Sequence, residues 1–137
     1  MRHKRVAKKF GRSTSHREQL MGGLVAHLIV QGRIETTLPK ARQTRRDAEK
    51  IVTLARKGTL AARRLAAARL RSPDAVRRLF DDVVPAMEGR PGGYTRIIKT
   101  RARRGDAAEM ALIEWVAGLK AAAAPAPAPE VHDGMQA

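Results

Sequence analysis

The 137-residue sequence predicts one α+β domain, with helices over most of its length and a β hairpin near its end. Apolar residues recur at helical spacing in about four stretches. About three short runs have the composition of strands. Aromatic residues make up only 3% of the chain, so the core must consist mainly of Leu, Ile, Val and Ala, which we take to favour helices.

The first helix is predicted to begin near Ser15 and to end at Gly32. Ser15 and Glu18 have the spacing of a capping box, which satisfies two backbone amides at a helix start. Leucines and other apolar residues then form two neighbouring ridges on one helical face. Gly22 and Gly23 weaken such a helix by about 1 kcal/mol each relative to Ala. We therefore expect another segment to pack very close to these glycines.

A short strand and a second helix are predicted next. The strand is 33–37, which is rich in β-branched residues. Thr37 is the expected cap of the second helix, Pro39 lies in its first turn, and Gly58 ends it. Basic side chains surround much of the remaining helical surface: Lys40, Arg42, Arg45, Arg46 and Lys50.

Two further helices and a hairpin follow. The third helix is expected over about 59–71, and Ser72 caps a fourth that Pro85 ends. The runs 94–102 and 109–116 flank a turn and form the hairpin. The second run is apolar on both faces except for Glu114. One face should meet the helices, and the other needs cover or a partner.

Both ends of the chain differ from this domain. Residues 1–12 are basic and show no helical or strand period. Beyond Leu119, alternating Ala and Pro favour neither helix nor strand. The predicted organisation is a basic extension at 1–12, a globular domain at 13–119 and a disordered Ala/Pro-rich tail at 120–137.

Charge restricts the class of partner. The chain has 28 Lys and Arg against 13 Asp and Glu, a net charge of +15 and a pI near 11.6. Such a balance indicates a polyanion, and nucleic acid is the first candidate. A membrane surface fits less well, because the basic residues are spread along the chain. The absence of Cys excludes disulfides and Cys-based zinc sites. Without a predicted membrane span or signal peptide, we expect a cytoplasmic protein.

No motif indicates an enzyme. The sequence contains no Gly-rich phosphate loop, no nucleophile elbow and no metal-spaced pair among its four His, so we expect no cofactor, no metal and no small-molecule substrate. The tripeptide at 104–106 resembles a cell-adhesion motif, but here we interpret it as a turn. Phe10 and Tyr94 lie among basic residues and could stack on unpaired bases. Alternatively, Phe10 anchors the basic extension 1–12 (the arm) against the first helix, and Tyr94 is a core residue at the start of a strand.

Several short motifs follow one another over about residues 1–117: "MRHK" at 1–4, "SHR" at 15–17, "GRIETTLPKA" at 32–41, "TLA" at 53–55, "ARRLA" at 62–66, "LF" at 79–80, "GGYTRI" at 92–97, "RRGDAA" at 103–108 and "IE" at 113–114. In this order they resemble the bacterial large-subunit ribosomal protein seventeen family. The resemblance implies a two-layer domain with a small mixed sheet and helices on one side. It also implies binding to large-subunit ribosomal RNA near the polypeptide exit, beside other large-subunit proteins.

We therefore predict a structural constituent of the large ribosomal subunit. The expected RNA contacts are Arg2, His3, Lys4, Arg5, Lys8, Lys9, Phe10, Arg12, Ser15, His16, Arg17, Lys40, Arg42, Arg45, Arg63, Arg64, Gly93, Tyr94, Arg96, Lys99, Arg101, Arg103 and Arg104. A free-standing nucleic-acid-binding regulator or chaperone is the alternative. Such a regulator would need a recognition helix or dimer symmetry to read duplex DNA, and neither is evident in the sequence.

Overall fold

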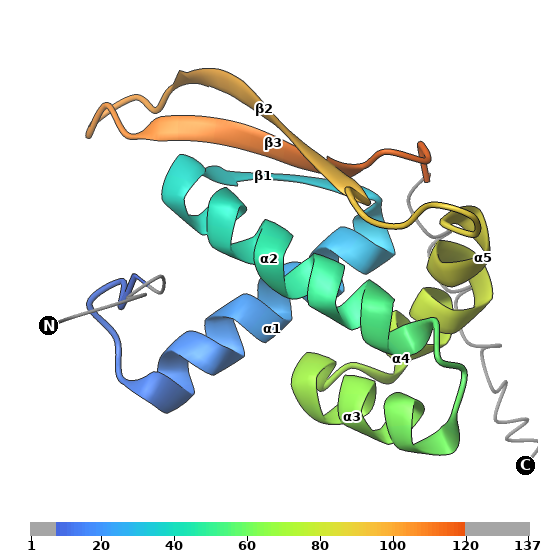
Figure 1. Cartoon of the computed structure of the whole chain (residues 1–137). Coiled ribbons are helices and arrows are strands. Elements are labelled where there is room, and N and C mark those ends of the chain that lie inside the picture. The colour runs from blue at the N-terminus through green and yellow to red at the C-terminus, as the bar shows by residue number, and fades with distance from the viewer. Residues whose placement is uncertain (1–7, 120–137) are drawn as a thin grey trace, which may run out of the picture.

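The computed structural model describes residues 8–119 as helices beneath a small sheet (Figure 1). The elements, in chain order, are α1 (Thr14–Gln31), β1 (Arg33–Thr37), α2 (Leu38–Ala55), α3 (Leu60–Leu70), α4 (Pro73–Arg78), the π-helical segment η1 (Leu79–Val83), α5 (Val84–Ala86), β2 (Thr95–Ala102) and β3 (Glu109–Trp115). The predicted α+β class and the arrangement of helices on one side of the sheet are confirmed.

The sheet has the strand order β1-β3-β2, and each described pairing is antiparallel. The implied mixed sheet is therefore wrong in that detail. The reason lies in the order of the strands. β1 and β2 run in the same direction, but β3 separates them, so no parallel pair forms. The last of the described strands thus pairs with both others and holds the sheet together.

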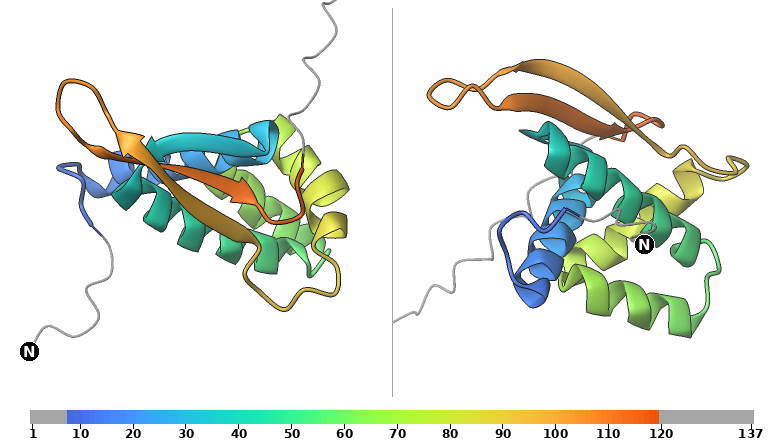
Figure 2. Two further views of the ribbon diagram at one scale, coloured as in Figure 1. Left: turned by 90° about the horizontal axis from the view of Figure 1, so that it is seen from above. Right: turned by 60° about the vertical axis from the view of Figure 1, so that its left-hand side comes forward.

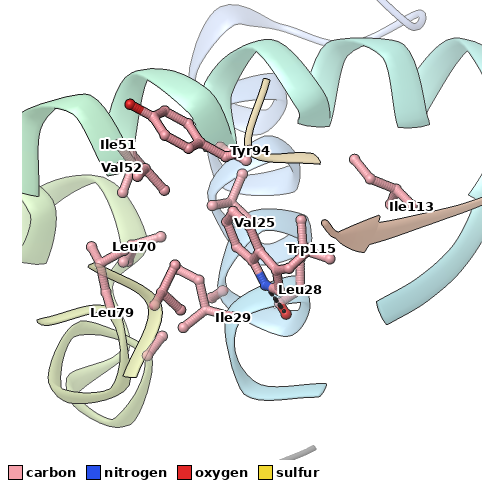
Figure 3. Close-up of a cluster of buried hydrophobic side chains, with 14 of the residues drawn as sticks. Val25, Leu28, Ile29, Ile51, Val52, Leu70, Leu79, Tyr94, Ile113 and Trp115 are labelled. Atoms are coloured by element: carbon pink, nitrogen blue, oxygen red, sulfur yellow. Dashed lines mark hydrogen bonds between the residues drawn. The ribbon is translucent and has the colours of Figure 1, made fainter. Parts of the chain in front are cut away.

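The inner face of the sheet joins the helical core. Ala111, Ile113 and Trp115 alternate along β3 and are buried, as the period of a strand requires. Figure 3 shows Ile113 and Trp115 with Val25, Leu28 and other apolar residues of the helices. Trp115 Nε1 donates to the carbonyl oxygen of Leu28 at 3.0 Å, which satisfies the polar atom of a buried indole.

The start of α1 and the end of the fourth helix differ from prediction. The helix begins at Thr14 after the N-cap Ser13, and Ser15 lies inside its first turn, so the predicted capping box at Ser15 is wrong. Pro85 does not end the fourth helix, which continues through η1 to Ala86. In an α-helix, the ring of a proline clashes with the carbonyl group four residues earlier. The wider π turn before Pro85 moves that carbonyl group away from the ring.

Other local predictions are confirmed. Ser72 caps α4 through its side-chain oxygen, as predicted. Thr59 caps α3 in the same way, which was not predicted from the sequence. A β-carbon built on Gly22 would lie 2.5 Å from the backbone oxygen of Arg69 on α3. A β-carbon on Gly23 would have no atom within 4 Å. The expected close approach is thus made at Gly22, and Gly23 takes no part in it.

Candidate nucleic-acid interface

Basic segments that are far apart in the sequence lie at one end of the molecule. The arm residues 8–12, the first turn of α1 that follows them, the first turns of α2 and the tip of the β2–β3 hairpin all lie on the left of Figure 1, and Figure 2 shows the same grouping from above. We call this region the basic end. It contains most of the predicted contacts within residues 8–119: Lys8, Lys9, Phe10, Arg12, Ser15, His16, Arg17, Lys40, Arg42, Arg101, Arg103 and Arg104.

A groove between α2 and β2 adjoins the basic end. Its volume is about 410 Å³, and its lining residues are Leu38, Arg42, Arg45, Arg46, Glu49, Ile97 and Lys99. Four of these seven side chains are basic and one is acidic. The predicted contacts Arg42, Arg45 and Lys99 are therefore brought together by the fold. We call this feature the α2–β2 groove.

Glu49 organises the groove. Its carboxylate pairs with the Nε of Arg45 at 3.4 Å, one helical turn away. The Oε1 atom of Glu49, which pairs with Arg45, also accepts a hydrogen bond from the Thr95 hydroxyl at 3.3 Å. Because Thr95 belongs to β2, Glu49 links helix to sheet while it orients one guanidinium. A planar guanidinium held in this way presents its remaining N–H groups as donors for a phosphate.

The hairpin tip carries a second set of guanidinium groups. Arg103 pairs with Asp106 through two nitrogens, and the Ala108 amide donates to the same carboxylate. The Arg103 bonds, followed by the Ala108 amide, hold the pKa of Asp106 far below its usual range. Arg101 pairs with Glu35 of β1 at 3.4 Å. Exposed ion pairs contribute little to stability, so phosphates can replace these carboxylates at small cost.

The arm reaches α1 through an irregular turn. Phe10 has a positive φ of 54° and is partly buried. Arg12 donates to the Phe10 carbonyl oxygen at 2.9 Å. Among the described residues, the buried Nε of Arg12 has no hydrogen-bond partner. Lys8 and Lys9 are exposed. The remaining predicted contacts of the arm, Arg2, His3, Lys4 and Arg5, lie outside the described residues, as does the predicted tail at 120–137.

The predicted contacts at the end of the loop before β2 and at the start of β2 differ in their exposure. Tyr94 is only 1% exposed, and its hydroxyl accepts a hydrogen bond from Arg56 at 2.9 Å. Its ring occupies the core and is not presented for stacking. Gly93 is exposed with a φ of 63°, a conformation that favours glycine. Arg96 projects from the outer face of the sheet and pairs with Glu114 on β3.

Two predicted contacts lie elsewhere. Arg63 and Arg64 belong to α3, on the far side of α2 from the sheet (Figure 1). The guanidinium of Arg63 stacks over the Phe80 ring, 4.3 Å from its centroid, which is a cation–π contact. These two residues do not join the basic end.

Sequence reasoning left Arg46 out of the predicted contacts, although it lines the α2–β2 groove. Arg46 follows Arg42 by four residues, so the two side chains lie on the same face of the helix. This spacing could have identified Arg46 as a further candidate contact. Nothing in the sequence showed that this face would meet β2.

Metal-binding clusters and membrane-spanning helices are both absent from residues 8–119. Within residues 8–119, no group of three or more His, Asp or Glu is placed to hold a metal ion. No helix there has the length and apolar character needed to cross a bilayer. What the basic end and the groove do present is a set of guanidinium and ammonium donors from separate elements. This chemistry suits phosphates along a folded nucleic acid.

Comparison with known proteins decides the family. The family model described as "Ribosomal protein L17" matches residues 20–116. The chain belongs to this family. A "Large ribosomal subunit protein bL17" of Methylacidiphilum infernorum (isolate V4) is 51% identical over 118 residues, which are 86% of this chain and 90% of that protein. The protein of the same name in Campylobacter concisus (strain 13826) is 51% identical over 117 residues, 85% of this chain and 99% of its own length.

Membership of the L17 family has two consequences for the predictions. The resemblance inferred from the motifs is confirmed. The family consists of ribosomal proteins and not of enzymes, in agreement with the expectation that the chain is not an enzyme. The matched residues 20–116 include the α2–β2 groove and the hairpin tip.

Proposed function

We propose that the protein is a structural constituent of the large subunit of the cytoplasmic ribosome, where it binds and stabilises the large-subunit RNA. Its relatives bear the name of a large-subunit protein and are matched over nearly their whole length. The observation that carries RNA binding is the convergence of Arg42, Arg45 and Lys99 in the α2–β2 groove, next to the basic hairpin tip. These cations come from elements that only the fold brings together, as expected of a surface that follows a shaped RNA backbone.

The proposed position is near the polypeptide exit, as the resemblance of the motifs implies. The arm fits this assignment, because a basic extension without an apolar face can be ordered by folded RNA of opposite charge. Crosslinks from the arm and the hairpin tip to RNA nucleotides would locate the protein. Crosslinks confined to RNA remote from the exit would contradict the position while leaving RNA binding intact.

Neighbouring large-subunit proteins are the second proposed class of partner, and the outer face of the sheet is the surface that suits them. Met110 and Leu112 of β3 lie on this face, beside Ile98, which is 45% exposed. Arg96, Glu114 and Glu35 lie around this apolar strip. An apolar centre with a charged rim is typical of a protein contact and unsuited to phosphates.

The groove is tested by removing two of its cations. Arg42→Gln with Arg45→Gln should lower the steepness of the salt dependence of rRNA binding by roughly 0.7–0.9 log units for each phosphate that is no longer neutralised. Arg77→Gln with Arg90→Gln is the matched control. Both arginines are exposed and lie outside the groove, and the double substitution removes the same two positive charges. Equal salt dependence in the two double variants would overturn the groove as the contact site.

The assembly itself is tested by sedimentation of a cell lysate. Stoichiometric migration with the large subunit at high magnesium supports the proposal. A free-standing regulator or chaperone would instead remain in the light fractions at both high and low magnesium.

A further inference from the structure

A second concave surface lies on the helical side of the molecule, between α1, α2 and α3. Its volume is about 520 Å³, within the range of roughly 300–1,000 Å³ common for sites of small ligands. We call it the three-helix cleft. Its lining residues are Arg17, Glu18, Met21, Gly22, Val25, Gln43, Asp47, Lys50, Ile51, Ala68, Arg69 and Arg71. Among the predicted RNA contacts, only Arg17 lines this cleft.

The cleft has an apolar floor and a basic rim. Met21, Val25 and Ile51 belong to the core and close the cleft from below. The absence of a side chain at Gly22 lets the backbone of α3 at Arg69 come against α1, which fixes one wall. Four lining side chains are basic and two are acidic, so the surface carries a net positive charge. An anionic occupant therefore fits better than the chain's own basic arm.

Asp47 gives the wall a specific acceptor. Gln43 Nε2 lies 3.4 Å from each of its carboxylate oxygens, a long distance for a hydrogen bond. Partial burial raises the pKa of Asp47, and this effect outweighs the Gln43 bond and the nearby charges of Lys50 and Arg69. An ionised carboxylate is purely an acceptor with two oxygens side by side. Two parallel N–H donors would stabilise it most.

One RNA base matches this pattern. Guanine carries two adjacent N–H donors, N1–H and the N2 amino group, on its Watson–Crick edge. Adenine and cytosine place an acceptor beside their single amino group, and uracil places its N–H between two acceptors. The apolar floor suits the base, and the basic rim suits the phosphate of a nucleotide.

We propose that the three-helix cleft binds an unpaired guanine of an RNA strand, with the Asp47 carboxylate accepting from N1–H and the N2 amino group. The rim cations Arg17, Lys50, Arg69 and Arg71 neutralise the flanking phosphates. This assignment rests on the proposed function for its source of RNA. It adds a base-reading site to surfaces that otherwise contact the backbone.

The test uses the full chain and three seven-nucleotide RNAs, each with six uridines and a central guanosine, inosine or adenosine. Fluorescence anisotropy measures the affinities. The guanosine RNA should bind roughly 5- to 150-fold more tightly than the adenosine RNA, the span expected for a bidentate base contact. Inosine keeps N1–H and lacks the amino group, so its affinity should be intermediate. Equal binding of the three RNAs would overturn the proposal.

Two variants assign the preference to the cleft. Asp47→Asn replaces one acceptor oxygen by a donor and should remove the preference for guanosine. Asp74→Asn makes the same charge change at an exposed position of α4 and should keep it. Ala68→Leu narrows the cleft from α3 without changing charge and should also remove the preference. Melting curves establish that each variant is folded.

The outcomes separate this inference from the proposed function. If the preference for guanosine persists in both Asp47→Asn and Ala68→Leu, guanosine is recognised at another surface, and the proposal for the cleft is wrong. Retained binding to large-subunit RNA, without any base preference, likewise overturns the cleft while the ribosomal role stands. Loss of all binding to large-subunit RNA at physiological salt would contradict the ribosomal role itself.

Discussion

At the scale of single residues, a buried core residue and an exposed candidate contact lie close together in the sequence. Tyr94 and Arg96 are two positions apart, yet Tyr94 is buried in the core and Arg96 lies on the outer face of the sheet. The period of a strand explains the direction of each side chain only once the strand is known to begin at Thr95. The sequence alone left the role of Tyr94 open, because an aromatic residue among basic residues fits both a core and an RNA surface.

Substitutions at Tyr94 and at Arg96 should therefore differ in their effect on stability. Tyr94→Ala should cost about 3–5 kcal/mol of stability, as for other large core truncations. Tyr94→Phe should cost about 1 kcal/mol, because Arg56 loses one of its two acceptors and keeps the Arg90 carbonyl oxygen. Arg96→Ala should lower the melting temperature far less than Tyr94→Ala, since the Arg96 side chain is largely exposed, although its partner Glu114 is only 16% exposed. Thermal melts of the three variants check this, and an unchanged melting temperature for Tyr94→Ala would contradict the core role.

The carboxyl of Asp106 should titrate well below its ordinary value. Its folded pKa is lowered, so the pairing with Arg103 is fully present above the unfolded pKa near 3.8 and is lost as the pH falls through the lower folded value. Carboxyl NMR during an acid titration measures this. Arg103→Gln should move the pKa back toward 3.8, because the largest cause of the shift is removed.

At the scale of elements, sequence patterns predicted what local chemistry determines. Helix α4 begins at Pro73 because Ser72 caps it, and β1 occupies the β-branched stretch 33–37 as expected. The start of α1 could not be distinguished by pattern, since Ser13, Thr14 and Ser15 all suit an N-cap. The π turn before Pro85 has no sequence signature that we recognise. Most of the fold was thus accessible, and the exact ends of the helices were less so.

The candidate site was less predictable than the fold. Its residue types were evident from charge, but the α2–β2 groove depends on β2 lying beside α2, which no local pattern specifies. The cation–π contact of Arg63 with Phe80 likewise joins separate helices. Long-range neighbours of this kind follow from the whole fold.

Two adjacent glycines test the packing of α1 against α3. Gly22→Ala should destabilise the protein, because its β-carbon would meet the Arg69 backbone oxygen at 2.5 Å and one helix must shift. Gly23→Ala is the control in the same turn, and it should stabilise by about 0.5–1 kcal/mol because it only adds helix propensity. Denaturant melts measure both. Equal effects of the two substitutions would show that the close approach is not maintained in solution.

At the scale of the whole molecule, positive charge is gathered from separated segments. The chain carries a net charge of +15, and its described basic end combines an arm, a helix start and a hairpin tip. Positive charges on separate segments can contact different parts of one extended polyanion, and they make its binding strongly dependent on salt concentration. Neither the arm nor the hairpin tip needs to form a pocket of its own.

Deletion of residues 1–12 should leave a folded domain, because the α1 cap Ser13 and the apolar ridges remain. The deletion should lower the salt slope of rRNA binding by roughly 0.7–0.9 log units for every phosphate that the arm neutralises. Circular dichroism checks the fold, and binding at several salt concentrations gives the slope. An unchanged slope would mean that the arm is not an anchor.

The central position of β3 imposes an order on folding during synthesis. β1 pairs only with β3 in the described sheet, and α2, α3 and the helical run after α3 are made between them. At roughly 5–20 residues per second, β1 waits several seconds for its partner. The helices can gather early, but the sheet closes only after Trp115 has been translated. A chain released too soon would therefore expose an unpaired strand edge, which is prone to aggregation.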